Sequence, residues 1–241
     1  MNETQYQQLH GRFAVVHDRL QYTAGRIFEI VQRHLALNAV LDVGCGTGDF
    51  LFQANKRGMA DVLGIEGAWA ANSRFLLEPD KRRLIDLEQP FDLARTFDLV
   101  ISLEVAEHLS ARAAQGFVES LVRHGDFVLF SAAIPQQGGI NHVNEQWPAY
   151  WAAQFRAHGF DCHDFIRWEI WEDELLPFYY RQNIFLYARR SVVERGDPRI
   201  VKPFPPSPKL VPVVHPTLYR KKVKALIDAE ARRTPPGTSR A

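Results

Sequence analysis

Three glycines at alternate positions form the part of the chain that is best suited to hold a ligand. Gly44, Gly46 and Gly48 follow an apolar run of strand type at residues 40–43 and precede a predicted helix. Glycine lets the backbone approach a ligand closely, and the free N–H groups at the start of a helix point toward it. The third glycine comes one residue too early for the dinucleotide-binding pattern, and no lysine follows it as in phosphate-binding loops. The segment therefore predicts a cofactor site of another kind.

Two carboxylates and a histidine lie close together after a predicted strand at residues 97–102. They are Glu104, Glu107 and His108. One interpretation is local packing and hydrogen bonding of the histidine. A second makes His108 a general base, because an imidazole of ordinary pKa can take up a proton near neutral pH. A third is a metal site, because two carboxylates and an imidazole within five residues can converge on one divalent ion.

Polar residues crowd the loop that follows a predicted strand at residues 126–131, and an aromatic helix comes next. One interpretation is a helix start in which Asn144 or Glu145 caps the helix and the aromatic rings join the core. That interpretation leaves the density of histidine, amide and carboxylate groups unexplained. Sites for sugars combine aromatic platforms with amide and carboxylate partners for hydroxyl groups. We therefore predict a catalytic role for His142, His108 or Glu104, and substrate contacts from Asn144, Glu145, Trp147 and Tyr150.

The elements that must position these residues alternate between strand and helix from residue 39 onward, which indicates a parallel sheet with helices on both faces. We expect strands near residues 40–43, 62–66, 82–86, 97–102, 126–131, 160–168 and 184–188, and helices near 47–57, 68–77, 111–122 and 146–158. Before the sheet, the apolar spacing over residues 7–36 predicts one or two helices that cover the cofactor site and are interrupted near residues 23–25.

The C-terminal region has a different composition. Seven of the 14 prolines lie between Pro198 and Pro216, which excludes a regular helix or central strand there. We predict an extended arm that wraps the domain or mediates homo-oligomer formation, then a short helix near 217–232 and a disordered tail from Thr234. The expected organisation is a helical cap over residues 1–38, an α/β domain over 39–190, and the arm and tail over 191–241.

The composition argues against several classes of protein. Lys and Arg number 29 against 28 acidic residues, so a net charge of +1 gives no overall attraction to nucleic acid or membrane surfaces. No run of about 18 apolar residues is present to span a bilayer, and the polar N-terminus does not match a secretory signal. Only two cysteines occur, Cys45 in the glycine loop and Cys162 far from it in sequence, and this sparse use of cysteine fits a reducing cytoplasm.

Taken in order, the motifs of residues 39–131 resemble those of the class I methyltransferases that depend on S-adenosylmethionine (SAM). The resemblance implies a Rossmann-like, seven-stranded, mostly parallel sheet that ends in an antiparallel hairpin. It also implies that Glu66, after the second strand, accepts hydrogen bonds from the ribose hydroxyls, and that Asp86, after the third, lies near the adenine amino group. The cofactor-binding residues implied in this way are Asp42, Gly44, Cys45, Gly46, Thr47, Gly48, Glu66, Asp86, Leu87 and Ser102.

A second resemblance concerns the acceptor. The segment from His142 to Pro148, and those around Trp168, Tyr179 and His215, are similar to segments of methyltransferases from bacterial surface-polysaccharide gene clusters. This resemblance implies O-methylation of a hydroxyl on a sugar or glycan. An alcohol is a poor nucleophile near neutral pH, so a base or a metal ion must assist the transfer.

Two alternatives remain open. The Glu104-x-x-Glu107-His108 pattern also resembles the metal triad of ubiquinone-pathway O-methyltransferases and of small-RNA 2′-O-methyltransferases, which add a later histidine. That resemblance implies a divalent ion held by Glu104, Glu107, His108 and His142, and an RNA or small-molecule hydroxyl as the acceptor. The other alternative is a SAM-binding protein without catalysis, against which the intact glycine loop and the polar loop around His142 argue.

Overall fold

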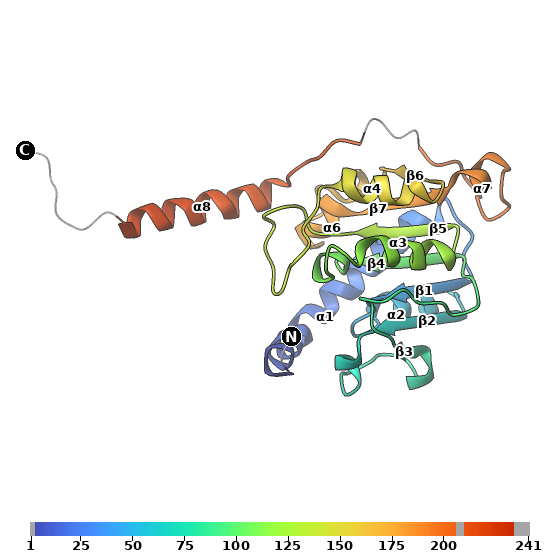
Figure 1. Cartoon of the computed structure of the whole chain (residues 1–241), viewed down its shortest axis with the longest axis horizontal. Helices are drawn as coiled ribbons and strands as arrows, with labels where there is room; N and C mark the ends of the chain where they lie inside the picture. Colours follow the sequence, from blue (N-terminus) through green and yellow to red (C-terminus); the bar gives the residue numbers. More distant parts are fainter. Residues whose placement is uncertain (1–2, 206–209, 234–241) are drawn as a thin grey trace, which may run out of the picture.

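The computed structural model describes residues 3–205 and 210–233, and its centre is a seven-stranded sheet (Figure 1). The strand order is β3-β2-β1-β4-β5-β7-β6. The strands are β1 Ala39–Val43, β2 Asp61–Glu66, β3 Arg82–Leu84, β4 Leu99–Leu103, β5 Phe127–Ser131, β6 Phe160–His163 and β7 Phe185–Arg189. β7 runs antiparallel to both of its neighbours, and the other pairings are parallel. The predicted Rossmann-like, mostly parallel fold is therefore confirmed.

Helices cover both faces of the sheet. They are α1 Glu3–Gln32, α2 Asp49–Lys56, α3 Ala114–Arg123, α4 Pro148–Ala157, α5 Ile166–Ile170, α6 Phe178–Asn183, α7 Arg190–Glu194 and α8 Pro216–Arg233, with 3₁₀ turns η1 Ala68–Ala70, η2 Pro79–Lys81 and η3 Ala106–His108. Residues of α1, α2, α5 and α6 pack into one apolar layer, whereas those of α3 and α4 pack into the other. Among the described residues, no helix is long and apolar enough to cross a bilayer.

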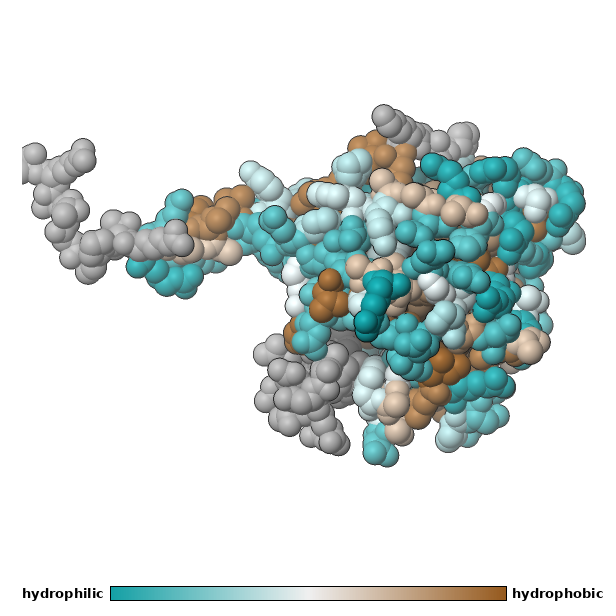
Figure 2. All heavy atoms as spheres, in the orientation of Figure 1, coloured by the Kyte–Doolittle hydropathy of each residue, from teal (hydrophilic) through white to brown (hydrophobic). Residues whose placement is uncertain are grey.

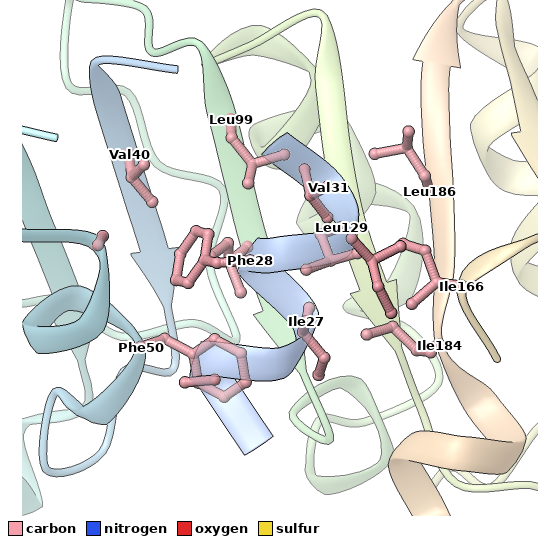
Figure 3. Packing of buried hydrophobic residues seen from close by; sticks show 14 of the residues in the cluster. Ile27, Phe28, Val31, Val40, Phe50, Leu99, Leu129, Ile166, Ile184 and Leu186 are labelled. Carbon is pink, nitrogen blue, oxygen red and sulfur yellow. The ribbon is translucent and has the colours of Figure 1, made fainter. Parts of the chain in front are cut away.

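The central strands are apolar on both faces because each face carries a helical layer. Successive side chains of a strand point to opposite faces, so Leu99 joins the layer of α1 while Val100 joins that of α3. Figure 3 shows Ile27 and Phe28 of α1 packed over Leu129 and neighbouring strand residues. This packing places the N-terminal helix against the sheet.

Three predicted elements differ from the structure. The interruption near residues 23–25 is wrong because α1 is continuous, and the Thr23 hydroxyl donates back to the Arg19 carbonyl at 2.7 Å inside it. The helix at 68–77 is wrong because only the short turn η1 forms there. The Ser73 hydroxyl donates to the Ala70 carbonyl at 2.8 Å after that turn.

The strand predicted at 160–168 is too long, since β6 ends at His163 and α5 follows. The buried side chains of Asp164 and Arg167 form a two-bond ion pair, with N–O distances of 2.6 and 2.7 Å. Residues three apart lie on one side of a helical turn, whereas they point to opposite faces of a strand. The pair therefore favours the turn into α5.

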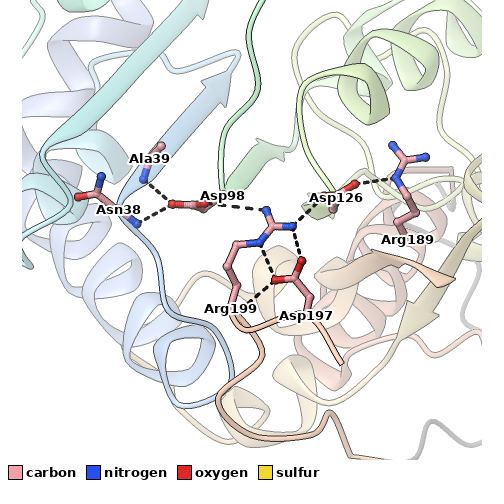
Figure 4. A network of polar contacts seen from close by, with 7 residues as sticks. All are labelled: Asn38, Ala39, Asp98, Asp126, Arg189, Asp197 and Arg199. Atoms are coloured by element: carbon pink, nitrogen blue, oxygen red, sulfur yellow. Dashed lines mark hydrogen bonds and ion pairs between the residues drawn. The ribbon is translucent and has the colours of Figure 1, made fainter. Parts of the chain in front are cut away.

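The chain after α7 lies along the edge of the sheet at which β1, β4 and β5 begin, and a cluster of charges holds it there (Figure 4). Arg199 contacts Asp126 and Asp197, both at 2.8 Å, and Asp98 at 3.8 Å. Asp98 also accepts the backbone N–H groups of Asn38 and Ala39, each at 2.9 Å, at the start of β1. The described part of the proline-rich segment contains no named strand or helix until α8, which corresponds to the predicted C-terminal helix.

The helix α8 extends away from the sheet (Figure 1). Figure 2 shows a mostly hydrophilic surface on this face, with apolar groups at several places, α8 among them. Its exposed apolar residues include Tyr219, Leu226 and Ile227. The predicted tail from Thr234 lies outside the described residues. The division of the chain into a helical cap, an α/β domain and a C-terminal arm stays a prediction.

We expect Arg199→Ala to lower the free energy of unfolding by about 1.5–3 kcal/mol, the usual contribution of hydrogen bonds to charged groups. Hydrogen bonding to Arg199 holds the pKa of Asp197 below its ordinary value of 3.8. This contribution is therefore fully present above that value and is lost as the pH falls through the lowered pKa. Arg190→Ala is the control, since its pair with Asp161 is exposed and is expected to contribute much less. Equal losses of unfolding free energy in the two variants, measured by urea unfolding, would contradict this assignment.

Candidate active site

The predicted site residues meet at one edge of the sheet, where β1, β2, β4 and β5 end. Parallel strands bring the residues that follow them to the same edge, and ligands of open α/β sheets bind there. The glycine loop follows β1, Glu66 ends β2, and Glu104 follows β4. The loop that carries His142 follows β5 and precedes α4.

The three loop glycines all have positive φ angles, +84° at Gly44, +53° at Gly46 and +82° at Gly48. The three positions differ in the atoms that an added side chain would contact. A Cβ at Gly44 would overlap the side chain of Val105, and one at Gly48 would lie 2.6 Å from the ring of Phe75. A Cβ at Gly46 would meet nothing within 4 Å. Gly44 and Gly48 are therefore required by packing, whereas Gly46 borders open space.

Glu66 joins the end of β2 to this loop. One carboxylate oxygen accepts the N–H of Gly46 and the other accepts the N–H of Gly67, each at 2.8 Å. Burial raises the pKa of Glu66, while these two hydrogen bonds act in the opposite direction. Each oxygen keeps a second lone pair, so the carboxylate can still accept from a pair of hydroxyl groups. This arrangement fits the ribose of SAM.

The other predicted cofactor residues have different surroundings. Asp42 is buried, and burial together with the charges of Glu66 and Asp49 raises its pKa well above the ordinary value. Asp86 is exposed after β3, where its side chain accepts the N–H of Glu88 at 3.0 Å. Cys45, Leu87 and Ser102 are buried, and the Ser102 hydroxyl has no hydrogen-bond partner in the described part of the chain.

The sequence interpretation missed a contact between α1 and the glycine loop. His17 lies 2.8 Å from Asp49, measured from Nδ1 to the carboxylate, and Gln21 donates to the same carboxylate at 2.6 Å. The hydroxyl of Thr47 also donates to Asp49. His17 and Gln21 are four residues apart on one helix, and that spacing was the only signal in the sequence.

At the same edge of the sheet, Glu107, His108 and His142 form a compact group in the segments that follow β4 and β5. Each offers a ligand atom, and these atoms lie within 4.8 Å of one another. The rings of His108 and His142 are perpendicular, with centroids 4.9 Å apart. The backbone N–H groups of Val143 and Asn144 donate to the Glu107 carbonyl at 2.8 and 3.0 Å. These two bonds attach the loop after β5 to the turn after β4.

Glu107 is buried, and neither of its carboxylate oxygens meets the geometry of a hydrogen bond to a described residue, although the Ala133 backbone and the Glu104 carboxylate lie close by. Burial, and then the charge of nearby Glu104, raises the pKa of Glu107 well above its ordinary value. An unpartnered buried carboxylate is costly unless a proton, a cation or another donor joins it. Burial likewise lowers the pKa of His108, with a smaller contribution from His142.

His142 is oriented by Glu145. Its Nδ1 lies 2.8 Å from the Glu145 carboxylate, which can only accept, so the proton is on Nδ1 and the Nε2 lone pair remains available. Glu145 also accepts the N–H of Gly138 at 2.7 Å. Burial acts in the opposite direction, yet these hydrogen bonds hold the pKa of Glu145 below its ordinary value. A Cβ at Gly139 would overlap the His142 ring, so only glycine leaves room for it.

The predicted substrate residues divide between surface and interior. Trp147 is 42% exposed, whereas Asn144 is buried with an unpartnered side-chain nitrogen among the described residues. Tyr150 is half-buried and packs edge-on against Trp151, with ring centroids 5.0 Å apart. Glu145 is committed to His142, as described above. The roles of all four toward an acceptor stay predictions.

Comparison with known proteins identifies the family to which the chain belongs. The model of the methyltransferase domain family matches residues 10–160, and no curated protein sequence matches the chain. DesVI of Streptomyces venezuelae is 15% identical, with 76% of this chain and 98% of that chain covered and a TM-score of 0.57. CalS10, an amino pentose methyltransferase of Micromonospora echinaspora, is 20% identical, with 78% and 98% covered and a TM-score of 0.55.

A third solved structure is KedS8, a sugar N-methyltransferase of a Streptoalloteichus species. It is 16% identical, with 79% of this chain and 93% of that chain covered and a TM-score of 0.51. At these identities the three structures show a shared fold. The family model spans more than half of the chain, from residue 10 to residue 160. The chain therefore belongs to the methyltransferase domain family, and it is a SAM-dependent methyltransferase.

Proposed function

We propose that the protein transfers the methyl group of SAM to a hydroxyl of a sugar or glycan. The observation that carries this proposal is the pairing of His142 with Glu145, at 2.8 Å, beside Glu107 and His108. A neutral amine can attack without a base, whereas an alcohol must lose its proton. CalS10 and KedS8 are described as acting on an amino pentose and on a sugar nitrogen, and these descriptions support a sugar as the acceptor class.

SAM, when bound, supplies an electrophilic methyl group for in-line displacement. In our proposal Glu66 accepts hydrogen bonds from the ribose hydroxyls, and the open space beside Gly46 receives the cofactor. His142 takes the acceptor's proton at Nε2. The negative charge of Glu145 on Nδ1–H stabilises the imidazolium that results. Trp147 and Asn144 lie on the same loop and are available to contact the acceptor.

Glu107, His108 and His142, with Glu104 beside them, also fit a divalent ion. The group combines a buried carboxylate that accepts no well-formed hydrogen bond among the described residues with two imidazoles, a donor set that suits first-row divalent metals. An ion held there would lower the pKa of a hydroxyl bound to it. Glu145 would then orient His142 as a ligand instead of a base.

A chelator experiment separates these two forms of assistance. If His142 acts as a base without an ion, we expect full turnover in excess chelator and no metal by elemental analysis of the purified protein. Loss of turnover in chelator, restored by Mn²⁺ or Mg²⁺, assigns the group to metal binding. SAM affinity, measured in the same samples by calorimetry, serves as the control because Glu66 and the glycine loop contain none of these ligands.

The proposal itself is tested with SAM labelled in its methyl group and a panel of free sugars, nucleotide sugars and oligosaccharides. We expect a methyl ether on a sugar oxygen, located by mass spectrometry and NMR. Labelling of an amino sugar at nitrogen alone would refute O-methylation and keep the sugar class. Labelling of RNA, with no sugar modified, would refute the sugar class.

A further inference from the structure

Three buried side-chain amides connect the segment before α8 to Glu104. They belong to Gln182 and Asn183 on α6 and to Gln137 in the loop after β5. At one end of this chain, the backbone N–H of His215 donates to the Gln182 side-chain oxygen at 2.7 Å. At the other end, Gln137 and Asn183 donate to the Glu104 carboxylate, each at 3.1 Å.

The hydrogen bonds that start at His215 lead through Gln182 toward Glu104. A backbone N–H can only donate, so His215 fixes the oxygen of Gln182 toward the arm and its NH₂ group toward the interior. That NH₂ group donates to Gln137 Oε1 at 3.1 Å and to Asn183 Oδ1 at 2.9 Å. Gln137 Oε1 also accepts the backbone N–H of Ile134 at 3.4 Å and the NH₂ group of Asn183 at 3.0 Å. With their oxygens occupied, Gln137 and Asn183 present NH₂ groups to Glu104.

The C-terminal arm is well anchored around His215, where this series of amide hydrogen bonds begins. The His215 ring packs on Trp171 with centroids 4.7 Å apart, and its Nδ1 accepts the N–H of Thr217 at 3.2 Å. Its Nε2 then carries the proton and donates to the Trp171 carbonyl at 3.3 Å. Leu218, in the first turn of α8, is buried. These contacts hold the His215 N–H in a fixed position relative to α6.

Glu104 needs such support because its φ angle is +56°, a left-handed conformation that is uncommon for a residue with a side chain. Its carboxylate also lies near that of Glu107. If the amides were reversed, their carbonyl oxygens would face the Glu104 carboxylate and repel it. The direction of the amide chain therefore determines whether Glu104 is held or displaced.

We propose that Gln182 is a positioning residue for Glu104, and that the C-terminal arm is part of the active site through the His215 N–H. This inference rests on the proposed function, in which Glu104 belongs to the acceptor side of the site. Gln182 touches neither Glu104 nor a reacting atom in this assignment. It acts by fixing the direction in which Asn183 donates and, together with the Ile134 N–H, the direction in which Gln137 donates.

Two variants of Gln182 test the direction of these amide hydrogen bonds. Gln182→Glu has the same shape and can still accept from His215, but its carboxylate cannot donate to Gln137 and Asn183. Gln182→Met has a similar length and can neither accept nor donate. We expect both to lower kcat by about 10–100-fold, the usual cost of losing a group that orients a site residue, with the Kd for SAM nearly unchanged. Gln154→Met, the same change on half-buried Gln154 of α4, is the control.

Wild-type kcat in folded Gln182→Glu would overturn the proposal, as would a loss of thermal stability in both variants with normal kcat. A second readout needs no turnover. In ¹⁵N NMR spectra, the side-chain NH₂ group of Asn183, whose oxygen accepts from Gln182, is expected to exchange slowly with solvent in the wild-type protein and quickly in Gln182→Met. Equal exchange in the two proteins would also overturn the proposal. If no sugar acceptor is methylated, the proposed function fails while this readout still tests the amide chain.

Discussion

His142→Ala is expected to lower turnover by about 10²–10⁴-fold, the usual contribution of a general base, while SAM affinity stays nearly unchanged. The reason is the geometry around the ring: Glu145 holds Nδ1–H at 2.8 Å, and Nε2 is the atom left to take a proton. The measurement is kcat with a saturating sugar acceptor, together with calorimetry of SAM binding. The loss is expected whether His142 is a base or a metal ligand, because both roles use the same nitrogen.

A suitable control is His158→Ala, which changes a histidine at the C-terminal end of α4. We expect that variant to keep wild-type kcat. A different result for His142→Ala would change the assignment. If the variant loses thermal stability and SAM binding together with turnover, His142 is an anchor for the loop after β5. The same pair of measurements on His108→Ala would then examine the next candidate.

The strands of the sheet could be predicted because their signals are local. Each central strand is a short apolar run between polar segments, and the glycine loop marks the end of β1 within a few residues. The errors arose where a tertiary contact overrides a local pattern. At residues 68–77 the spacing resembles a helix, yet the chain after η1 instead brings Phe75 against Gly48. Such a contact leaves no periodic trace in the sequence.

The candidate site could be predicted in part for the same reason. The residues that follow β1, β2 and β4 could be assigned to one edge because parallel strands end together there. The sequence could not predict that Asp49 binds α1, because His17 lies 32 positions earlier in the chain and belongs to another element. Likewise, Glu104 and Asn183 are separated by 79 positions, and their contact depends on how α6 packs against the sheet.

Gly46→Val is expected to weaken SAM binding by about 1–3 kcal/mol, the usual cost of forcing methyl groups into occupied space, or about 5- to 150-fold in Kd. Gly46 is the loop glycine whose added Cβ would meet no protein atom within 4 Å, so the side chain enters the space proposed for the cofactor. Calorimetry with SAM and with its demethylated product, S-adenosylhomocysteine, measures the effect.

The control must separate loss of the site from backbone strain. Gly58 is also left-handed, with φ +87°, and a Cβ there would likewise meet nothing within 4 Å, but it is exposed beyond α2. Both valine variants should therefore lose about 1–2 kcal/mol of stability to the left-handed conformation. Only Gly46→Val should lose SAM affinity. If the two variants bind SAM equally well, the open space beside Gly46 does not receive the cofactor, and the glycine is present only for the turn.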